Sequence, residues 1–279
     1  MTCVLNAFLY SLTNEWKSDN FIAILSDMET KQLFSNRVAD YLKYRPAYPT
    51  EIIDLLSSEY GLSKKKLVAD IGSGTGLLSR LFLTTGNSVW CVEPNAEMRR
   101  AAELELMQNK GFYSVDGSAE TTTLAPDYYD YVVAGQAFHW FDMQKAQQEF
   151  CRIIKPSGRV VFIWNSRRTD TPFLTEYEKL LQQYAATYAI SRHRNITTET
   201  ISEFTRSPVK LHIFPNRQTF DLTSLKGRML SSSYVPKAGQ PGYEKMIIEL
   251  VRLFNKFEED QRISFLYETR MYVSEMRCH

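Results

Sequence analysis

Two patterns of apolar and polar positions alternate along the middle of the chain. Short runs that are apolar on both faces predict buried β-strands, and they are residues 66–71, 88–93, 111–115, 129–134 and 159–164. Segments with apolar residues at helical spacing lie between them, at residues 76–86, 96–108 and 142–154. Because this alternation is typical of a parallel sheet covered on both faces, we predict a doubly wound α/β fold.

Helical patterns also flank this alternation. Residues 32–43 and 51–60 predict two helices, separated by the prolines of YRPAYP. Beyond residue 164 we predict helices at residues 171–189, 198–205, 222–231 and 242–259, and strands at residues 209–220 and 262–274. The segment after the fifth strand is expected to lie over the carboxyl ends of the strands, where open α/β sheets bind ligands.

These patterns divide the chain into four parts. They are an N-terminal extension (residues 1–30), an α/β core (31–165), a helical lid or substrate insertion (166–208) and C-terminal strands and helices that complete the sheet and the substrate pocket (209–279). Residues 1–27 lack the basic head and the cleavage site of a signal peptide. Two alternatives stay open for them: an extra helix packed on the domain, or translation that begins at Met28.

Charge and cysteine usage narrow the function classes. With 33 basic and 32 acidic residues, the chain has no global field that would attract nucleic acid or anionic lipid. No apolar run approaches the roughly 20 residues of a membrane span. The four cysteines lie far apart, without a CxxC pair, which argues against a zinc site or a disulfide framework and for a reducing compartment. We therefore expect a cytoplasmic protein without a metal, nucleic-acid or membrane partner.

The stretch DIGSGTG carries the strongest chemical signal. Gly72, Gly74 and Gly76 allow a sharp turn from strand to helix and close approach of a ligand to the backbone. A dinucleotide fingerprint would need a third glycine at position 77, which is Leu77. Asp70 would repel a pyrophosphate but attract an ammonium group. The loop therefore predicts a nucleoside that carries an amino acid.

A second acid follows at the end of the next strand. The Glu93 carboxylate can accept two hydrogen bonds from a ribose diol. Pro94 and Met98 would contact an adenine through apolar atoms. Nicotinamide dehydrogenases share this acid and the fold, but Leu77 and Asp70 argue against that alternative.

In this order, DIGSGTG, Glu93, GSAETTTLAPDYYDYVVAGQAFHW and IIKPSGRVVFIWN resemble the class I S-adenosylmethionine-dependent methyltransferases. YLKYRPAYP and GQAFHWF resemble their small-molecule subgroup related to trans-aconitate methyltransferase. The resemblance covers about residues 32–165 and, less specifically, the tail with GRMLSSSYVPKAGQPGY. It implies a Rossmann-like sheet, mostly parallel with an antiparallel last strand. It also implies S-adenosylmethionine as cofactor, S-adenosylhomocysteine as product, a small-molecule acceptor, and a monomer or weak homodimer.

The resemblance also implies cofactor contacts. Asp70 and the backbone around Gly72 and Gly74 would hold the methionine part, and Tyr41 and Arg45 would close over its carboxylate. The cofactor-binding set it implies is Tyr41, Arg45, Asp70, Gly72, Gly74, Gly76, Glu93, Pro94, Met98, Ser118, Ala119, Glu120, Gln136 and Ala137. Many relatives have Asp in place of Ser118, so the adenine amine would here contact the Ser118 hydroxyl, Glu120 or water.

Three residues are candidates for the transfer step, an in-line displacement that chiefly needs alignment and, for a protonated acceptor, a base. His139 is either that base or a residue that shapes the pocket, and we favour the second role. Trp140 would form an aromatic wall near the sulfonium, and Tyr234 would reach the acceptor. A protein that binds the cofactor without methylating, as a regulator or a cyclisation catalyst, remains an alternative. The Asp- or Asn-Pro-Pro signature of base and amide methylation does not follow the fourth strand.

Overall fold

The computed structural model describes residues 44–185, 196–232 and 234–278. The N-terminal extension, the helix expected at residues 32–43 and the candidate residue Tyr41 lie outside the described residues.

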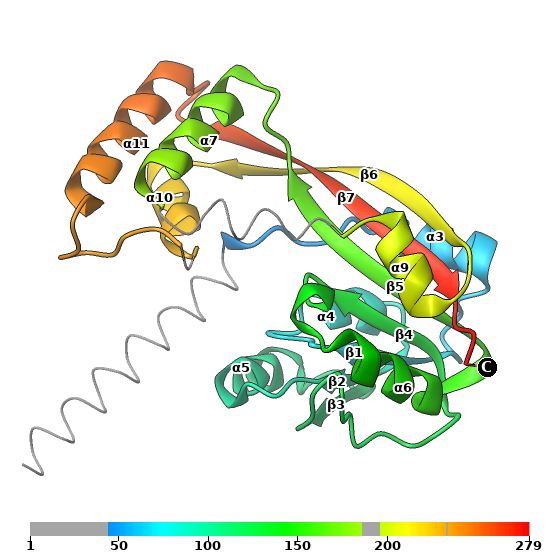
Figure 1. The fold of residues 1–279 in the computed structure, drawn as a ribbon. Helices are drawn as coiled ribbons and strands as arrows, with labels where there is room; N and C mark the ends of the chain where they lie inside the picture. Colours follow the sequence, from blue (N-terminus) through cyan, green and yellow to red (C-terminus); the bar gives the residue numbers. More distant parts are fainter. Residues whose placement is uncertain (1–43, 186–195, 233, 279) are drawn as a thin grey trace, which may run out of the picture.

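A seven-stranded sheet with the order β3-β2-β1-β4-β5-β7-β6 forms the centre of the molecule (Figure 1). Its strands are β1 (Leu67–Ile71), β2 (Ser88–Val92), β3 (Phe112–Val115), β4 (Tyr129–Gly135), β5 (Ile154–Arg167), β6 (Val209–Phe220) and β7 (Ile263–Glu275). The neighbours among β1 to β5 are parallel, whereas β7 is antiparallel to both β5 and β6. The predicted doubly wound, mostly parallel sheet is confirmed.

Helices cover both faces of the parallel part. One face is packed by α3 (Glu51–Tyr60), α4 (Leu77–Leu83) and α5 (Ala96–Leu106), whose buried side chains share one apolar cluster with the strands. The other face is packed by α6 (Met143–Ile153) and α9 (Thr198–Thr205), and a short 3-10 helix, η1 (Phe138–Trp140), precedes α6. The burial of both faces explains why the central strands are apolar throughout.

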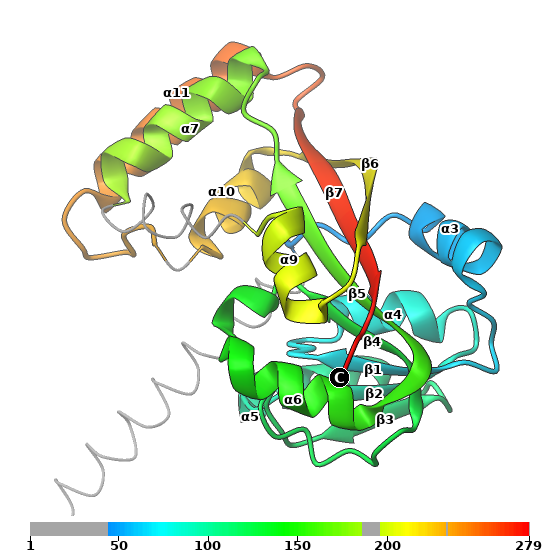
Figure 2. The ribbon, with the colours of Figure 1, turned by 45° about the vertical axis from the view of Figure 1, so that its right-hand side comes forward.

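Strands β5, β6 and β7 continue beyond the other strands as a twisted ribbon (Figures 1 and 2). Helices α7 (Pro172–Tyr184), α10 (Leu222–Leu230) and α11 (Tyr243–Phe257) pack at its far end and form, with it, a third apolar cluster. We call this part the appended subdomain. The expected insertion 166–208 is therefore divided between two parts of the molecule. The apolar face of α7 packs against α10 and α11, whereas that of α9 packs against the core.

One predicted turn has a different structure. The strand predicted at residues 159–164 should follow a turn, but β5 already begins at Ile154. Ile154 pairs with Tyr129 and Arg159 with Tyr131, so the extra residues between them form a bulge within the strand.

The expectation about the cysteines is wrong for one pair. Cys151, in α6, and Cys278, after β7, form a disulfide. They are separated by 127 positions in the chain, so their spacing carried no signal, and only the fold brings them together. The cysteine argument for a reducing compartment therefore loses its basis.

Candidate active site

The glycine loop between β1 and α4 turns through left-handed backbone. Gly72, Gly74 and Gly76 have φ angles of 68°, 57° and 78°. A Cβ at Gly72 would lie 2.7 Å from the Cβ of Ala137, whereas one at Gly74 would meet no atom within 4 Å. Gly72 and Gly76 are thus required by packing and conformation, and Gly74 presents bare backbone to open space.

Asp70, at the end of β1, is completely buried beneath this loop. Its Oδ2 accepts a hydrogen bond of 2.6 Å from the Ser79 hydroxyl, which in turn accepts one from the Cys91 thiol at 3.0 Å. Burial raises the pKa of Asp70 to about 7. Among the described residues, no donor reaches its Oδ1, and the loop hydroxyls of Ser73 and Thr75 also lack a partner. Buried polar atoms are rarely left unpaired, so this loop fits a polar, positively charged ligand group.

The Glu93 carboxylate, just after β2, ties the glycine loop to the next loop. It is 8% exposed. Its Oε2 accepts from the Gly74 backbone N–H at 2.9 Å, and its Oε1 accepts from Asn95 N–H at 2.8 Å. Each oxygen keeps a further lone pair, so this acceptor pair fits a diol. Beside it, Pro94 is exposed and Met98 is half-buried.

The residues expected at the adenine form a tight turn. The Ser118 N–H donates to the Thr121 carbonyl at 3.1 Å, and Ala119 is buried. Glu120 Oε1 accepts from the Asp142 N–H at 2.9 Å, which links this turn to the loop after β4. Burial alone would raise the pKa of Glu120, but hydrogen bonds from Asp142 and Ser118 hold it below its ordinary value. Glu120 therefore stays a charged acceptor at this edge.

The chain leaves β4 through a strained residue. Gln136 has a φ of 59°, the left-handed region that favours glycine, and its side chain donates to the Asn165 carbonyl at 3.3 Å. A Cβ at the preceding Gly135 would lie 2.5 Å from the Tyr48 hydroxyl. Such strain persists only where the surroundings enforce it, so Gln136 is held firmly at the carboxyl end of β4, next to the glycine loop.

Sequence reasoning missed the polar network that holds the segment before α3 in place. Asn165 Nδ2 donates to the Pro46 carbonyl at 3.1 Å, and Asn216 Nδ2 donates to the Ala47 carbonyl at 2.8 Å. The Thr269 hydroxyl bonds both asparagines. The only available signal was an asparagine within each of two apolar strand patterns, whose partners lie far away in the chain.

The three candidates for the transfer step lie in different places. His139 is half-buried in η1, and its ring centroid lies 5.0 Å from that of Trp140. Trp140 is 74% exposed, whereas the neighbouring Phe138 is fully buried. Tyr234 packs against the apolar cluster of the appended subdomain.

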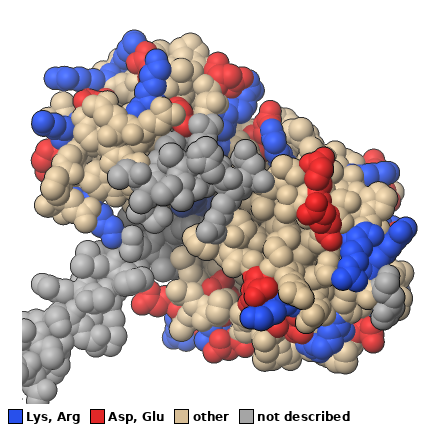
Figure 3. Space-filling view, in the orientation of Figure 1, with Lys and Arg blue, Asp and Glu red and all other residues tan. Residues whose placement is uncertain are grey.

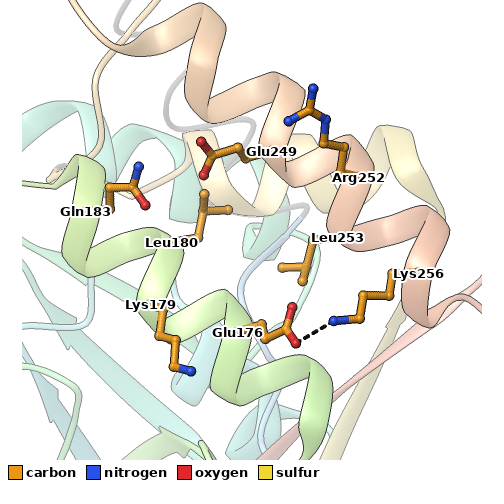
Figure 4. Close-up of a pocket in the computed structure, with 8 residues that line it drawn as sticks. All are labelled: Glu176, Lys179, Leu180, Gln183, Glu249, Arg252, Leu253 and Lys256. Atoms are coloured by element: carbon orange, nitrogen blue, oxygen red, sulfur yellow. Dashed lines mark hydrogen bonds and ion pairs between the residues drawn. The ribbon is translucent and has the colours of Figure 1, made fainter.

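A groove on the appended subdomain lies away from this edge of the sheet. It runs between α7 and α11 (Figure 4). The Lys256 ammonium crosses it to Glu176 at 2.7 Å, and Glu249 accepts from the Tyr184 hydroxyl at 2.7 Å. Its two acids are thereby paired, and it offers no convergent reactive groups.

Larger surface features set further limits. Basic and acidic side chains are interspersed on the face shown in Figure 3. In the parts of the chain that the structure describes, no helix has the length and apolar character needed to cross a membrane. Residues 44–185, 196–232 and 234–278 also contain no cluster of three or more His, Cys, Asp or Glu side chains arranged to hold a metal ion.

Comparisons with known proteins agree with this geometry. Residues 69–162 match a family described as "Methyltransferase domain". An uncharacterized methyltransferase of Schizosaccharomyces pombe is 26% identical over 249 residues, which cover 87% of this chain and 96% of that protein. A probable S-adenosylmethionine-dependent methyltransferase of Saccharomyces cerevisiae is 26% identical over 129 residues, or 44% of each chain.

A solved structure shows the same fold. It is that of a candidate type II methyltransferase from Anaeromyxobacter dehalogenans, which superimposes with a TM-score of 0.63 at 18% identity and covers 84% of this chain and 98% of its own.

Proposed function

We propose that this S-adenosylmethionine-dependent methyltransferase is of class I and that its acceptor is a small organic molecule, methylated on oxygen, nitrogen or carbon. The observation that carries the proposal is the ribbon of β5, β6 and β7. It extends from the cofactor edge of the sheet and carries a separate apolar cluster at its far end. The near-zero net charge also supports an acceptor other than nucleic acid.

The residues at the glycine loop fit the cofactor. Asp70 Oδ1 would receive its ammonium group, Glu93 its ribose hydroxyls, and the backbone at Gly74 would lie against it. Ser118, Ala119 and Glu120 would border the adenine. When bound, S-adenosylmethionine supplies a methyl group on a positively charged sulfur.

The other site residues would orient the acceptor and exclude water. Gln136 and Ala137 would form the floor next to the glycine loop, and this role is supported by the close approach of Ala137 to Gly72. Segment 44–48 covers this end and is fixed by Asn165 and Asn216. We assign His139 a positioning role, because it sits in η1 directly after this floor. Alignment of this kind is the main requirement of an in-line displacement.

A screen for S-adenosylhomocysteine release tests the proposal. The full chain is incubated with S-adenosylmethionine and, in separate arms, a metabolite extract, transfer RNA and a protein mixture. We expect release above background only with metabolites. The control is Glu93→Gln, which weakens cofactor binding. Release with only RNA or protein would contradict the small-molecule assignment.

A further inference from the structure

Arg228 is a buried cation without an acidic partner. It lies on α10 in the appended subdomain and is only 7% exposed. Its Nε donates to the Tyr267 hydroxyl at 3.5 Å and its Nη1 to the Ser232 hydroxyl at 3.4 Å, both long contacts to neutral groups. Among the described residues, no carboxylate oxygen lies within the 4.0 Å of an ion pair.

A second arginine of this subdomain, Arg167, has an acidic partner. Glu178, which is also buried, accepts from Arg167 Nη2 at 2.5 Å. The guanidinium of Arg167 lies 4.8 Å from the ring centroid of Tyr177. Burial raises the pKa of Tyr177 to about 12, so this phenol is neutral at physiological pH. Among the described residues, Arg228 thus has no carboxylate partner of its own, whereas Arg167 has one.

Such a charge is costly in a folded protein. Buried ions are normally paired, and a guanidinium cannot escape the cost by losing its proton. Arg228 lies on the same face of α10 as the buried Leu225 and Met229, where an apolar residue would fill the space without this cost. Unfavourable features of this kind are typical of binding sites, where the ligand supplies the missing partner.

A short segment connects Arg228 to the cofactor edge of the sheet. The Tyr44 ring packs directly against Gly227, and the Gln218 side chain bridges the Tyr44 carbonyl at 3.4 Å and the Tyr267 hydroxyl at 2.9 Å. Four residues later, the Tyr48 hydroxyl lies against Gly135. Even a fully extended chain spans only about 14 Å over four residues. Segment 44–48 therefore joins the surroundings of Arg228 to the cofactor edge over a short stretch of chain.

We propose that Arg228 binds an oxyanion group, a carboxylate or a phosphate, of the methyl acceptor. The acceptor is then a small organic acid. Arginine suits this role because its fork of N–H donors matches both anions. This inference rests on the proposed function, whose acceptor class it defines further.

Anion binding is measured on the full chain, with and without S-adenosylhomocysteine. Succinate and inorganic phosphate serve as probes for the two anion sources, and sodium chloride at equal ionic strength serves as the reference. We expect one probe to bind saturably by calorimetry and to raise the melting temperature. Arg228→Met should raise its dissociation constant at least about 30-fold, because the paired charge is removed. The exposed Arg252 provides the control, Arg252→Met, which should bind like the wild type.

Stability separates a binding role from a structural one. Without ligand, Arg228→Met should melt at the same or a higher temperature than the wild type, because it removes an unpaired charge and keeps the aliphatic stem. Arg228→Lys keeps the charge without the fork, so it should bind the probe more weakly than the wild type. If Arg228→Met does not fold, probe binding by Arg228→Lys decides between the two roles.

Three results would overturn the inference. They are that neither probe differs from chloride, that the substitution at Arg228 leaves probe binding unchanged, or that Arg228→Met melts clearly lower while probe binding persists. Failure of S-adenosylhomocysteine to bind would instead count against the proposed function, because the probes are also tested in its absence.

Discussion

The two halves of the site each bury a charge that lacks a charged partner among the described residues, and the charges are opposite. Asp70 lies under the glycine loop and Arg228 inside the appended subdomain. Asp70 can lose its charge by binding a proton, since burial raises its pKa to about 7. Arg228 stays charged at any physiological pH. The charge in the cofactor half therefore changes with pH, whereas the acceptor half keeps a positive charge that an anion would pair.

The halves also differ in what builds them. The cofactor half is built mainly by the backbone, through the left-handed glycines and the N–H groups that donate to Glu93. In the appended subdomain, side chains from α7, α10 and β7 form the cluster around Arg228. Substitutions should consequently act through strain in the first half and through charge in the second.

The largest effect is expected for Gly76→Ala. Its Cβ would run into the buried Leu106, in addition to the strain at a φ of 78°. We expect a loss of about 4 kcal/mol in the free energy of unfolding, measured with urea. Gly239→Ala, in the appended subdomain, has a similar φ of 82° and no atom within 4 Å, so it should cost only about 1 kcal/mol. Equal losses would contradict the contrast between the halves.

Asp70→Asn should change the pH dependence of stability. Because the folded pKa of about 7 lies above the unfolded value of 3.8, the native state binds the extra proton, and stability falls as pH rises between these values. Between pH 5 and 7 the wild type should lose about 2 kcal/mol from this group, and Asp70→Asn should not. The negative charge of Glu93 adds to the effect, because it also raises the pKa of Asp70. Unfolding is measured at several pH values with the exposed Asp116→Asn as control, and parallel curves for Asp70→Asn and wild type would refute the assignment.

Glu93→Gln should weaken cofactor binding about tenfold, since one charge-assisted acceptor is lost. Titration calorimetry with S-adenosylhomocysteine measures this, and Glu97→Gln on the exposed start of α5 is the matched control. An unchanged affinity would remove Glu93 from the site. Probe binding at Arg228 should persist in this variant, which shows that the halves act independently.

The smallest effect is expected for His139→Ala. If the His139 ring only shapes the pocket, turnover should fall a few-fold, and the acidic limb of the pH–rate profile should be retained. Steady-state kinetics with an acceptor found in the metabolite screen measure this. If turnover instead falls about 100-fold and the acidic limb disappears, His139 is the base.

How much the sequence predicted also differs between the halves. The strands, most helix limits and the glycine loop follow from local patterns, so the prediction of β6 at residues 209–220 is confirmed to the residue. Contacts between distant residues were not predictable, because no local spacing encodes them. Asn165 meets Asn216, and Cys151 meets Cys278, only after the sheet is assembled. Arg228 looked like an ordinary helix residue until the fold showed its burial.

The position of β7 has a consequence for how the chain folds. This last strand lies inside the sheet, between β5 and β6, and Arg167 of β5 pairs with Tyr267 across a long chain separation. During synthesis β6 emerges before β7, its one strand partner among the described residues, so β6 stays unpaired until β7 has been made. Pairing over such separations is slow, whereas β1 to β4 can associate earlier. Completion of the acceptor half should therefore be the late step, and truncation of β7 would leave β6 unpaired as well.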